Sequence, residues 1–284
     1  MGLNRDAKGV ETDPIEHTYR WQDVALYALG VGAAADDLDF LYEKRGPRVY
    51  PTWAVVPAYE ACKALFDVVD GDLGGVVHGS QKITLHRPFA PSGTLTTIGR
   101  VEGVYDLKRM AQSTIVTETR DADGQLLCET EWVIMYLKDG GFGGEPPPRS
   151  PKYRPPERDP DWSVAAKTTP EQAHLYRLGG HDYNPLHVDP EAAMLAEKVT
   201  MGRPILHGLC TYGYIARAIL VEECGSDPAR LKTFYGRFSK PIWPGETIVT
   251  EGWRMDDRLI VRAATAERPD EHIFTNAYAE LETP

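Results

Sequence analysis

Cysteine is scarce in this sequence, and its placement excludes two kinds of site. The 284-residue chain contains only 4 cysteines, which are scattered along its length. No two of them form a CxxC pair, and none is spaced from a histidine as in a zinc-binding motif. Isolated cysteines of this kind are typical of reduced thiols in the cytosol, so we expect a cytoplasmic protein without a metal site.

Long apolar runs and an excess of positive charge are also missing. No apolar stretch approaches the roughly 18 residues that a membrane-spanning helix needs, and the polar N-terminus lacks the apolar core of a secretory signal. With 31 Lys and Arg against 42 Asp and Glu, the formal net charge is −11. A nucleic-acid-binding protein would present a net basic face. We therefore expect neither a membrane nor a nucleic acid as a partner, although a local basic cluster is compatible with an anionic small ligand.

One segment differs sharply in composition from the rest of the chain. Residues 139–163 read DGGFGGEPPPRSPKYRPPERDPDWS. Glycine loosens the backbone and proline removes an amide donor, so neither a helix nor a sheet ladder can run through such a segment. We interpret it as a linker between two domains, residues 1–138 and 164–284.

The two halves show the same predicted order of elements. Each begins with a shorter and a longer apolar helix, and each continues with strands that alternate between apolar and polar residues. The predicted helices are 23–29, 53–69, 169–178 and 209–224, and the predicted strands are 77–87, 93–102, 110–120, 126–137, 232–239, 247–255, 259–266 and 273–281.

A local repeat supports this parallel. Pro88 and Pro91 match Pro241 and Pro244 at a constant offset, and each pair is followed by a threonine and an aliphatic residue. A duplicated α+β unit, with one central helix and a mostly antiparallel sheet in each copy, explains the match. The alternative is a coincidence of proline placement.

The polar stretch LGGHDYNPLHVD, residues 178–189, holds the candidate catalytic groups. Pro185 disfavours helical geometry at Asn184, so the side chains of Asp182 and Asn184 can lean to the same side. We expect His187 to turn back toward them, so that the three groups hold one water molecule. Histidine can accept and return a proton near neutral pH, while Asp182 is a partner acid or base and Asn184 orients the water.

An alternative role for the same residues is to cap the backbone. Asp and Asn in loops that contain proline commonly form Asx-turns. The matching stretch of the first half decides between the two roles. There, Ala33, Ala35 and Leu38 stand in the places of the polar trio, so the turn does not need those side chains. We infer a catalytic second copy and a degenerate first copy.

The motifs GGHDYNPLHVDPEAA, residues 179–193, and GRPILHGLCTYG, residues 202–213, closely resemble the (R)-specific enoyl-CoA hydratase 2 family, which is MaoC-like. The resemblance covers nearly the whole chain and implies an α+β double hotdog whose N-terminal copy is degenerate. It implies that Asp182 and His187 activate water and exchange the α-proton, and that Asn184 positions the water. His181, between Gly180 and Asp182, departs from the family pattern, as does a longer connection from His187 to His207.

The resemblance also implies that the backbone amide of Gly208 binds the thioester oxygen. The residues agree, because His207-Gly208 opens a predicted apolar helix whose first amides are unpaired and carry positive partial charge. Such donors suit a developing enolate. For His207 itself, packing at the helix start is the more common role than catalysis or substrate binding.

The implied reaction is the reversible addition of water to a trans-2-enoyl-CoA, which gives a (3R)-3-hydroxyacyl-CoA. It needs no cofactor, and neither a GxGxxG at a strand-to-helix step nor a Walker lysine occurs in the sequence. The substrate carries coenzyme A, whose diphosphate needs positive charge. The candidates are Lys198, Arg203, Arg237 and Lys240, each of which is otherwise a solvated surface charge.

The apolar stretch at residues 53–57 of the first half indicates space for medium or long acyl chains. The family resemblance further implies a homodimer. Three other functions stay open: a dehydratase of acyl-carrier-protein thioesters, a thioesterase and a non-catalytic acyl-CoA-binding protein.

Overall fold

The computed structural model describes residues 2–282 and contains one large antiparallel sheet. Its 10 strands follow the order β1-β3-β4-β5-β2-β7-β10-β9-β8-β6, so the strands of each half form one side of the sheet. The strands are β1 (Ile15–Tyr19), β2 (Val76–Leu85), β3 (Gly93–Asp106), β4 (Ala111–Arg120), β5 (Leu126–Tyr136), β6 (Trp162–Lys167), β7 (Leu231–Phe238), β8 (Thr247–Arg254), β9 (Leu259–Thr265) and β10 (Phe274–Leu281).

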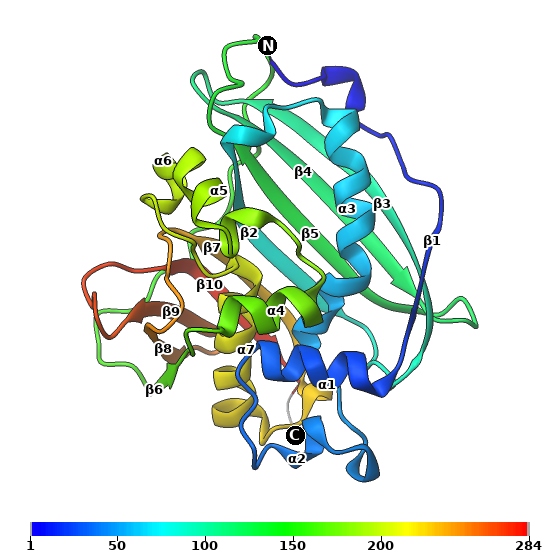
Figure 1. The fold of residues 1–284 in the computed structure, drawn as a ribbon, viewed down its shortest axis with the longest axis vertical. Helices are drawn as coiled ribbons and strands as arrows, with labels where there is room; N and C mark the ends of the chain where they lie inside the picture. Colours follow the sequence, from blue (N-terminus) through cyan, green and yellow to red (C-terminus); the bar gives the residue numbers. More distant parts are fainter. Residues whose placement is uncertain (1, 283–284) are drawn as a thin grey trace.

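The central helix of the first half is α3 (Val55–Val69), which lies over strands β3, β4 and β5 (Figure 1). It buries Ala58, Cys62, Leu65 and Val69, which recur at the spacing of one helical face. The helix approaches the sheet closely at Gly99, where an added Cβ would lie 3.2 Å from Ala61. The two shorter helices of this half are α1 (Trp21–Gly30) and α2 (Leu38–Leu41).

The second half repeats this arrangement around α7 (Gly208–Cys224), which packs against β7 and β8. Its other helices are α4 (Gln172–Gly180), α5 (Pro190–Leu195) and α6 (Glu197–Thr200). The last two fill the long connection between His187 and His207. Among residues 2–282, no helix combines the length and the apolarity that crossing a membrane requires.

Strands β2 and β7 join the two halves. They pair antiparallel, with Ser80 opposite Arg237 and Thr84 opposite Thr233. Both strands lead into the prolines of the sequence repeat, since β2 ends at Leu85 and β7 at Phe238. The expected pair of α+β units, each with a mostly antiparallel sheet around one central helix, is therefore present.

A second contact between the halves joins α1 to α4. The helices meet at Gly179, where an added Cβ would lie 2.6 Å from the backbone nitrogen of Tyr27. Gln172 Nε2 donates to the carbonyl of Gly30 at 2.8 Å, and the rings of Tyr27 and Tyr176 lie 5.9 Å apart. This contact fixes the end of α4 and hence the start of the polar loop.

The division of the chain into two domains joined by residues 139–163 stays a prediction. Residues 139–161 contain no helix or strand, whereas the last two residues of the predicted linker belong to strand β6, which begins at Trp162. The reason is the side chain of Trp162, which is buried and donates to Glu223 at 2.5 Å. Within the linker, Tyr153 packs on Tyr278 with ring centroids 4.3 Å apart, so this segment lies against the second half.

Candidate active site

The polar loop begins where α4 ends. His181 is the C-cap of α4 and takes a left-handed conformation with φ 57°, which stops the helix and turns the chain. Asp182 Oδ1 then accepts from the backbone amide of Asn184 at 3.1 Å, and Asn184 Oδ1 accepts from that of Leu186 at 3.2 Å. The Asx-turns considered as an alternative are thus present. The side chain of Asn184 is exposed, and its expected place beside a water molecule stays a prediction.

His187 ends a short 3₁₀ turn and is buried, with 9% of its surface exposed. Its Nδ1 lies 2.8 Å from the carbonyl oxygen of Ile205. Because a carbonyl only accepts, Nδ1 carries the hydrogen and Nε2 keeps a free lone pair. Burial lowers the pKa of His187, although the nearby Asp182 opposes this effect. The ring is therefore a neutral base at neutral pH.

His207, the N-cap of α7, packs directly against His187. The two rings are stacked with centroids 3.8 Å apart, and His207 is fully buried. Its Nε2 donates to the backbone carbonyl of Asp182 at 3.2 Å. Burial, and then the neighbouring His187, lower the pKa of His207 well below its ordinary value. His207 is thus packed at the helix start and also holds the backbone of Asp182, and its role in substrate binding stays a prediction.

Asp182, His187 and His207 form one cluster, in which a carboxylate oxygen and a ring nitrogen of each histidine all lie within 4.8 Å of one another. The predicted acid and base groups therefore meet. Two imidazoles and a carboxylate are also a possible donor set for a divalent metal ion. The chemistry proposed below needs only the proton-transfer capacity of this cluster.

Gly208 is the first residue of α7 and lies next to the cluster. Its amide is among those at a helix N-terminus that have no intrahelical partner. An added Cβ here would lie 3.4 Å from the ring of Phe238, which is an ordinary van der Waals contact. The segment that precedes α7 contacts the segment that follows β7. The amide of Leu206 in the first segment donates to the carbonyl of Ile242 in the second at 2.8 Å.

The four expected coenzyme A ligands are all exposed. Arg237 and Lys240 lie one and two residues from Phe238, whose ring borders Gly208. Arg203 stacks on Trp243 with 4.4 Å between its guanidinium carbon and the ring centroid. Arg203, Arg237 and Lys240 thus belong to segments that border the start of α7, whereas Lys198 lies earlier in the chain, in α6.

Sequence reasoning missed one residue of the site, Tyr59 on α3. Its hydroxyl donates to Asp182 Oδ1 at 2.9 Å. No local motif indicates this contact, because the two residues lie 123 positions apart and belong to different halves. Only the packing of the first half against the polar loop brings them together.

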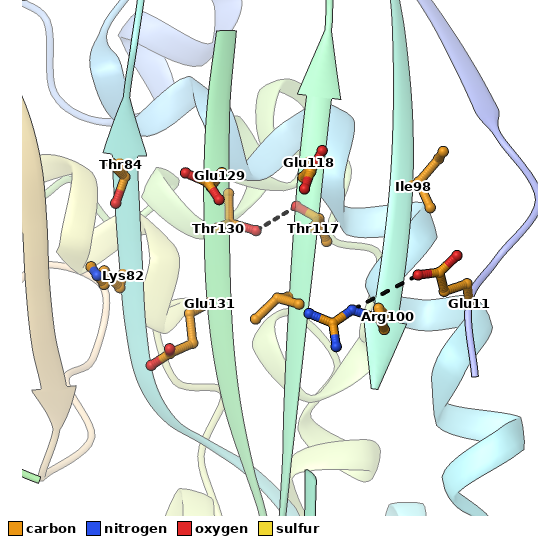
Figure 2. A pocket seen from close by; sticks show the side chains of 11 residues that line it. Glu11, Lys82, Thr84, Ile98, Arg100, Thr117, Glu118, Glu129, Thr130 and Glu131 are labelled. Carbon is orange, nitrogen blue, oxygen red and sulfur yellow. Dashed lines mark hydrogen bonds and ion pairs between the residues drawn. The ribbon is translucent and has the colours of Figure 1, made fainter. Parts of the chain in front are cut away.

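A depression on the sheet of the first half lies on the side away from α3 (Figure 2). Four carboxylates line it, but only two basic groups, and Arg100 is paired with Glu11 at 3.9 Å. A negative surface of this kind repels the phosphates of coenzyme A. The depression is separate from the Asp182 cluster and does not suit the same ligand. The residues that line it are Glu11, Lys82, Thr84, Ile98, Arg100, Val116, Thr117, Glu118, Glu129, Thr130 and Glu131.

Two known protein families match the chain in sequence. Residues 17–137 match the MFE-2 hydratase 2 N-terminal domain, and residues 152–275 match the MaoC like domain. The chain is 36% identical to Enoyl-CoA hydratase 2, peroxisomal, of Arabidopsis thaliana, with 89% of this chain and 87% of that protein covered. It is also 36% identical to 3-hydroxyacyl-thioester dehydratase Y of Mycobacterium tuberculosis, with 94% and 93% covered.

The fold has a close counterpart among solved structures. The crystal structure of a MaoC-like dehydratase from Phytophthora capsici superposes with a TM-score of 0.85 at 30% identity, and the match covers 99% of this chain and 98% of that one. The predicted α+β double hotdog is thereby confirmed over both halves.

Proposed function

Because the chain belongs to the MaoC-like hydratase 2 family, we propose that it is an (R)-specific trans-2-enoyl-CoA hydratase. The observation that carries this proposal is the meeting of the Asp182 carboxylate and the His187 imidazole within 4.8 Å, next to the first amides of α7. Hydration needs a proton acceptor for water, a proton donor for the α-carbon and a donor to the thioester oxygen. These residues provide all three.

The proton acceptor is His187. Its lone pair at Nε2 takes a proton from water, and the water oxygen adds to C3 of the enoyl group. The electron pair of the double bond moves onto the thioester oxygen, where the amide of Gly208 and the N-terminus of α7 stabilise the negative charge. The proton passes from His187 to the Asp182 carboxylate and then to C2. Both groups return to their starting state, and one water has been added.

Binding of the substrate divides between the two halves. Arg203, Arg237 and Lys240 flank the start of α7 and are our candidates for contacts with the coenzyme A phosphates. The degenerate first half, residues 1–138, accommodates the acyl chain beside α3. If a C4 substrate were turned over much faster than substrates of C10 or longer, this role for the first half would be wrong.

The reaction is redox-neutral, so we propose no cofactor besides the coenzyme A of the substrate. Rates that fall on removal of metal ions with a chelator would contradict this. We also retain a cytoplasmic homodimer as a proposal. The four cysteines are free and buried, in keeping with a reducing compartment, although the Arabidopsis relative is named peroxisomal. Light scattering of the purified protein tests the dimer.

The test of the function is a hydration assay with chiral analysis of the product. The loss of the enoyl-thioester absorbance is followed for coenzyme A and acyl-carrier-protein substrates, with a thiol reagent in parallel. We expect the (3R)-hydroxyacyl product with coenzyme A substrates and no free thiol. A preference for carrier-protein substrates would favour the dehydratase alternative, released thiol would indicate a thioesterase, and binding without turnover would indicate a non-catalytic protein.

A further inference from the structure

The hydrogen bond between Tyr59 and Asp182 links the degenerate half to the chemistry. A carboxylate only accepts hydrogen bonds, so the Tyr59 hydroxyl is the donor at 2.9 Å. Asp182 Oδ1 also accepts from the amide of Asn184 at 3.1 Å. Both bonds fall on the same oxygen, and among the described residues no hydrogen bond is found at Oδ2. This arrangement leaves Oδ2 free to exchange a proton in the proposed reaction.

The two bonds at Oδ1 differ in what they can fix. The bond from Asn184 is local and moves with the turn that contains both residues. The bond from Tyr59 comes from α3, a 15-residue helix packed on the sheet of the other half. The terminal torsion of an aspartate is broad and poorly defined by rotamer preference alone. An anchor outside the loop is therefore what fixes the plane of the carboxylate.

The hydroxyl remains a donor throughout the working range of the enzyme. Burial raises the pKa of Tyr59, and the negative charge of Asp182 raises it further. A tyrosine held in its neutral form donates steadily, unlike a group that titrates near neutral pH. The ring is partly buried and lies 6.3 Å from that of Trp132, which limits its freedom to move away.

We propose that Tyr59 is a positioning residue for Asp182, through which the degenerate hotdog contributes to catalysis as well as to acyl binding. This inference rests on the hydratase function proposed above. The proposal distinguishes two roles of the first half, namely lining the space for the acyl chain and orienting the catalytic carboxylate. A residue that only lines the acyl space affects KM, with a magnitude that depends on chain length. A residue that orients the carboxylate affects kcat, and to the same extent for every acyl chain.

The test is Tyr59→Phe, which removes the hydroxyl and keeps the ring. We expect kcat to fall about 10- to 100-fold, as misplacement of a reacting group typically costs. We expect KM to stay near the wild-type value, with the same loss for C4 and C10 substrates. Unchanged kcat, or a loss confined to KM that varies with chain length, would overturn the proposal. An inactive wild type would overturn the proposed function and this inference together, whereas an active wild type with an unaffected variant overturns the inference alone.

The chain offers a matched control at the corresponding position of the second half. Tyr212 lies on α7 as Tyr59 lies on α3, five residues into each helix. Its hydroxyl donates to the backbone carbonyl of Phe234 at 2.6 Å, away from Asp182. Tyr212→Phe is expected to lower the melting temperature and to leave kcat near wild type. If both variants lowered kcat equally, loss of stability would explain the effect and the positioning role would be wrong.

A double-mutant comparison provides a second readout. On the Asp182→Asn background the carboxylate is gone, so there is no charge for Tyr59 to orient. We expect Tyr59→Phe to have no further effect on the residual rate of that variant. An additional loss as large as that seen in the wild type would show that Tyr59 acts independently of Asp182 and would overturn the proposal.

Discussion

The imidazole rings of His187 and His207 are stacked in contact, with centroids 3.8 Å apart and planes inclined by 27°. Both rings are buried, so two adjacent positive charges here would be strongly unfavourable. Each ring donates from one nitrogen to a backbone carbonyl and keeps a lone pair on the other. In His207 that lone pair is on Nδ1, which is buried without a hydrogen-bond partner among the described residues, so water does not reach it. We therefore propose that His187 transfers the proton and that His207 supports the loop.

Replacement of His207 by alanine tests this division. His207→Ala removes the donor to the Asp182 carbonyl and leaves a partly buried acceptor unpaired. We expect a loss of about 1–3 kcal/mol in the free energy of unfolding and a fall in kcat smaller than that of His187→Ala. Denaturant unfolding and steady-state kinetics measure both quantities. If His207→Ala were well folded yet as inactive as His187→Ala, His207 would belong to the proton transfer itself.

The activity should persist to mildly acidic pH. Burial is the main cause that lowers the pKa of His187 from the ordinary value of 6.5. The ring therefore stays neutral, and able to accept a proton, at pH values slightly below 6.5. As the pH falls through the lowered pKa, protonation removes the lone pair and kcat/KM decreases. A pH profile of kcat/KM, with folding checked at each pH, measures this. An acidic limb centred at or above 6.5 would contradict the assignment.

Stability should also fall in acid, and His78 contributes to this fall. Its ring is stacked on Trp132 with centroids 5.3 Å apart, and burial lowers its pKa to about 4. Between about pH 6.5 and 4 the unfolded chain binds a proton at this residue and the folded chain does not, so the free energy of unfolding rises with pH. The folded state therefore loses stability as the pH falls from about 6.5 to about 4. The loss in the free energy of unfolding that is due to His78 is on the order of 3 kcal/mol.

Thermal unfolding across this pH range measures the effect, with a matched pair of variants. His78→Gln removes the titrating group and should make the slope of melting temperature against pH shallower. His174→Gln changes an exposed histidine of α4 and should leave the slope unchanged. Equal slopes in the wild type and both variants would show that His78 does not carry the dependence.

The proposed thioester site at Gly208 gives a prediction that separates activity from folding. An alanine Cβ would lie 3.4 Å from Phe238, an ordinary contact, so Gly208→Ala should fold. The methyl group would stand beside the amides that the thioester oxygen must reach, and we expect kcat/KM to fall about 100-fold.

Gly213→Ala in the same helix is the control for this variant. Its Cβ would lie 2.3 Å from Val31, so it should lower the melting temperature instead of acting at the site. If Gly208→Ala were fully active, the thioester oxygen would be bound elsewhere.

The sequence predicts the strands that are paired on both sides, because their alternation is long and regular. The two edge strands were not predicted. β1 and β6 are 5 and 6 residues long, and each pairs on one side only, so their pattern is short and only one neighbour constrains it. β6 also follows the Pro- and Gly-rich linker directly, and its first two residues were therefore assigned to the linker. α5 and α6 were missed because they have only 6 and 4 residues, too few to show a helical pattern.

Much of the site could be predicted because it is local in the chain. Asp182 and His187 lie in one loop and Gly208 is the first residue of α7, so two short motifs contain all three residues. Tyr59 could not be predicted, since its contact depends on how the two halves pack through β2 and β7 and through α1 and α4. The exposed side chain of Asn184 shows the limit of the local argument, because a motif gives the turn but not the direction of every side chain in it.

The measurement that tests the account most directly is kcat/KM for enoyl-CoA hydration by Asp182→Asn. Asparagine keeps the shape of aspartate and the oxygen that accepts from the Asn184 amide, so the loop should be retained. The account predicts a loss of about 10²–10⁴-fold, as for removal of a general acid–base group, with an unchanged circular dichroism spectrum. A folded Asp182→Asn enzyme that hydrates at a rate near wild type would contradict it.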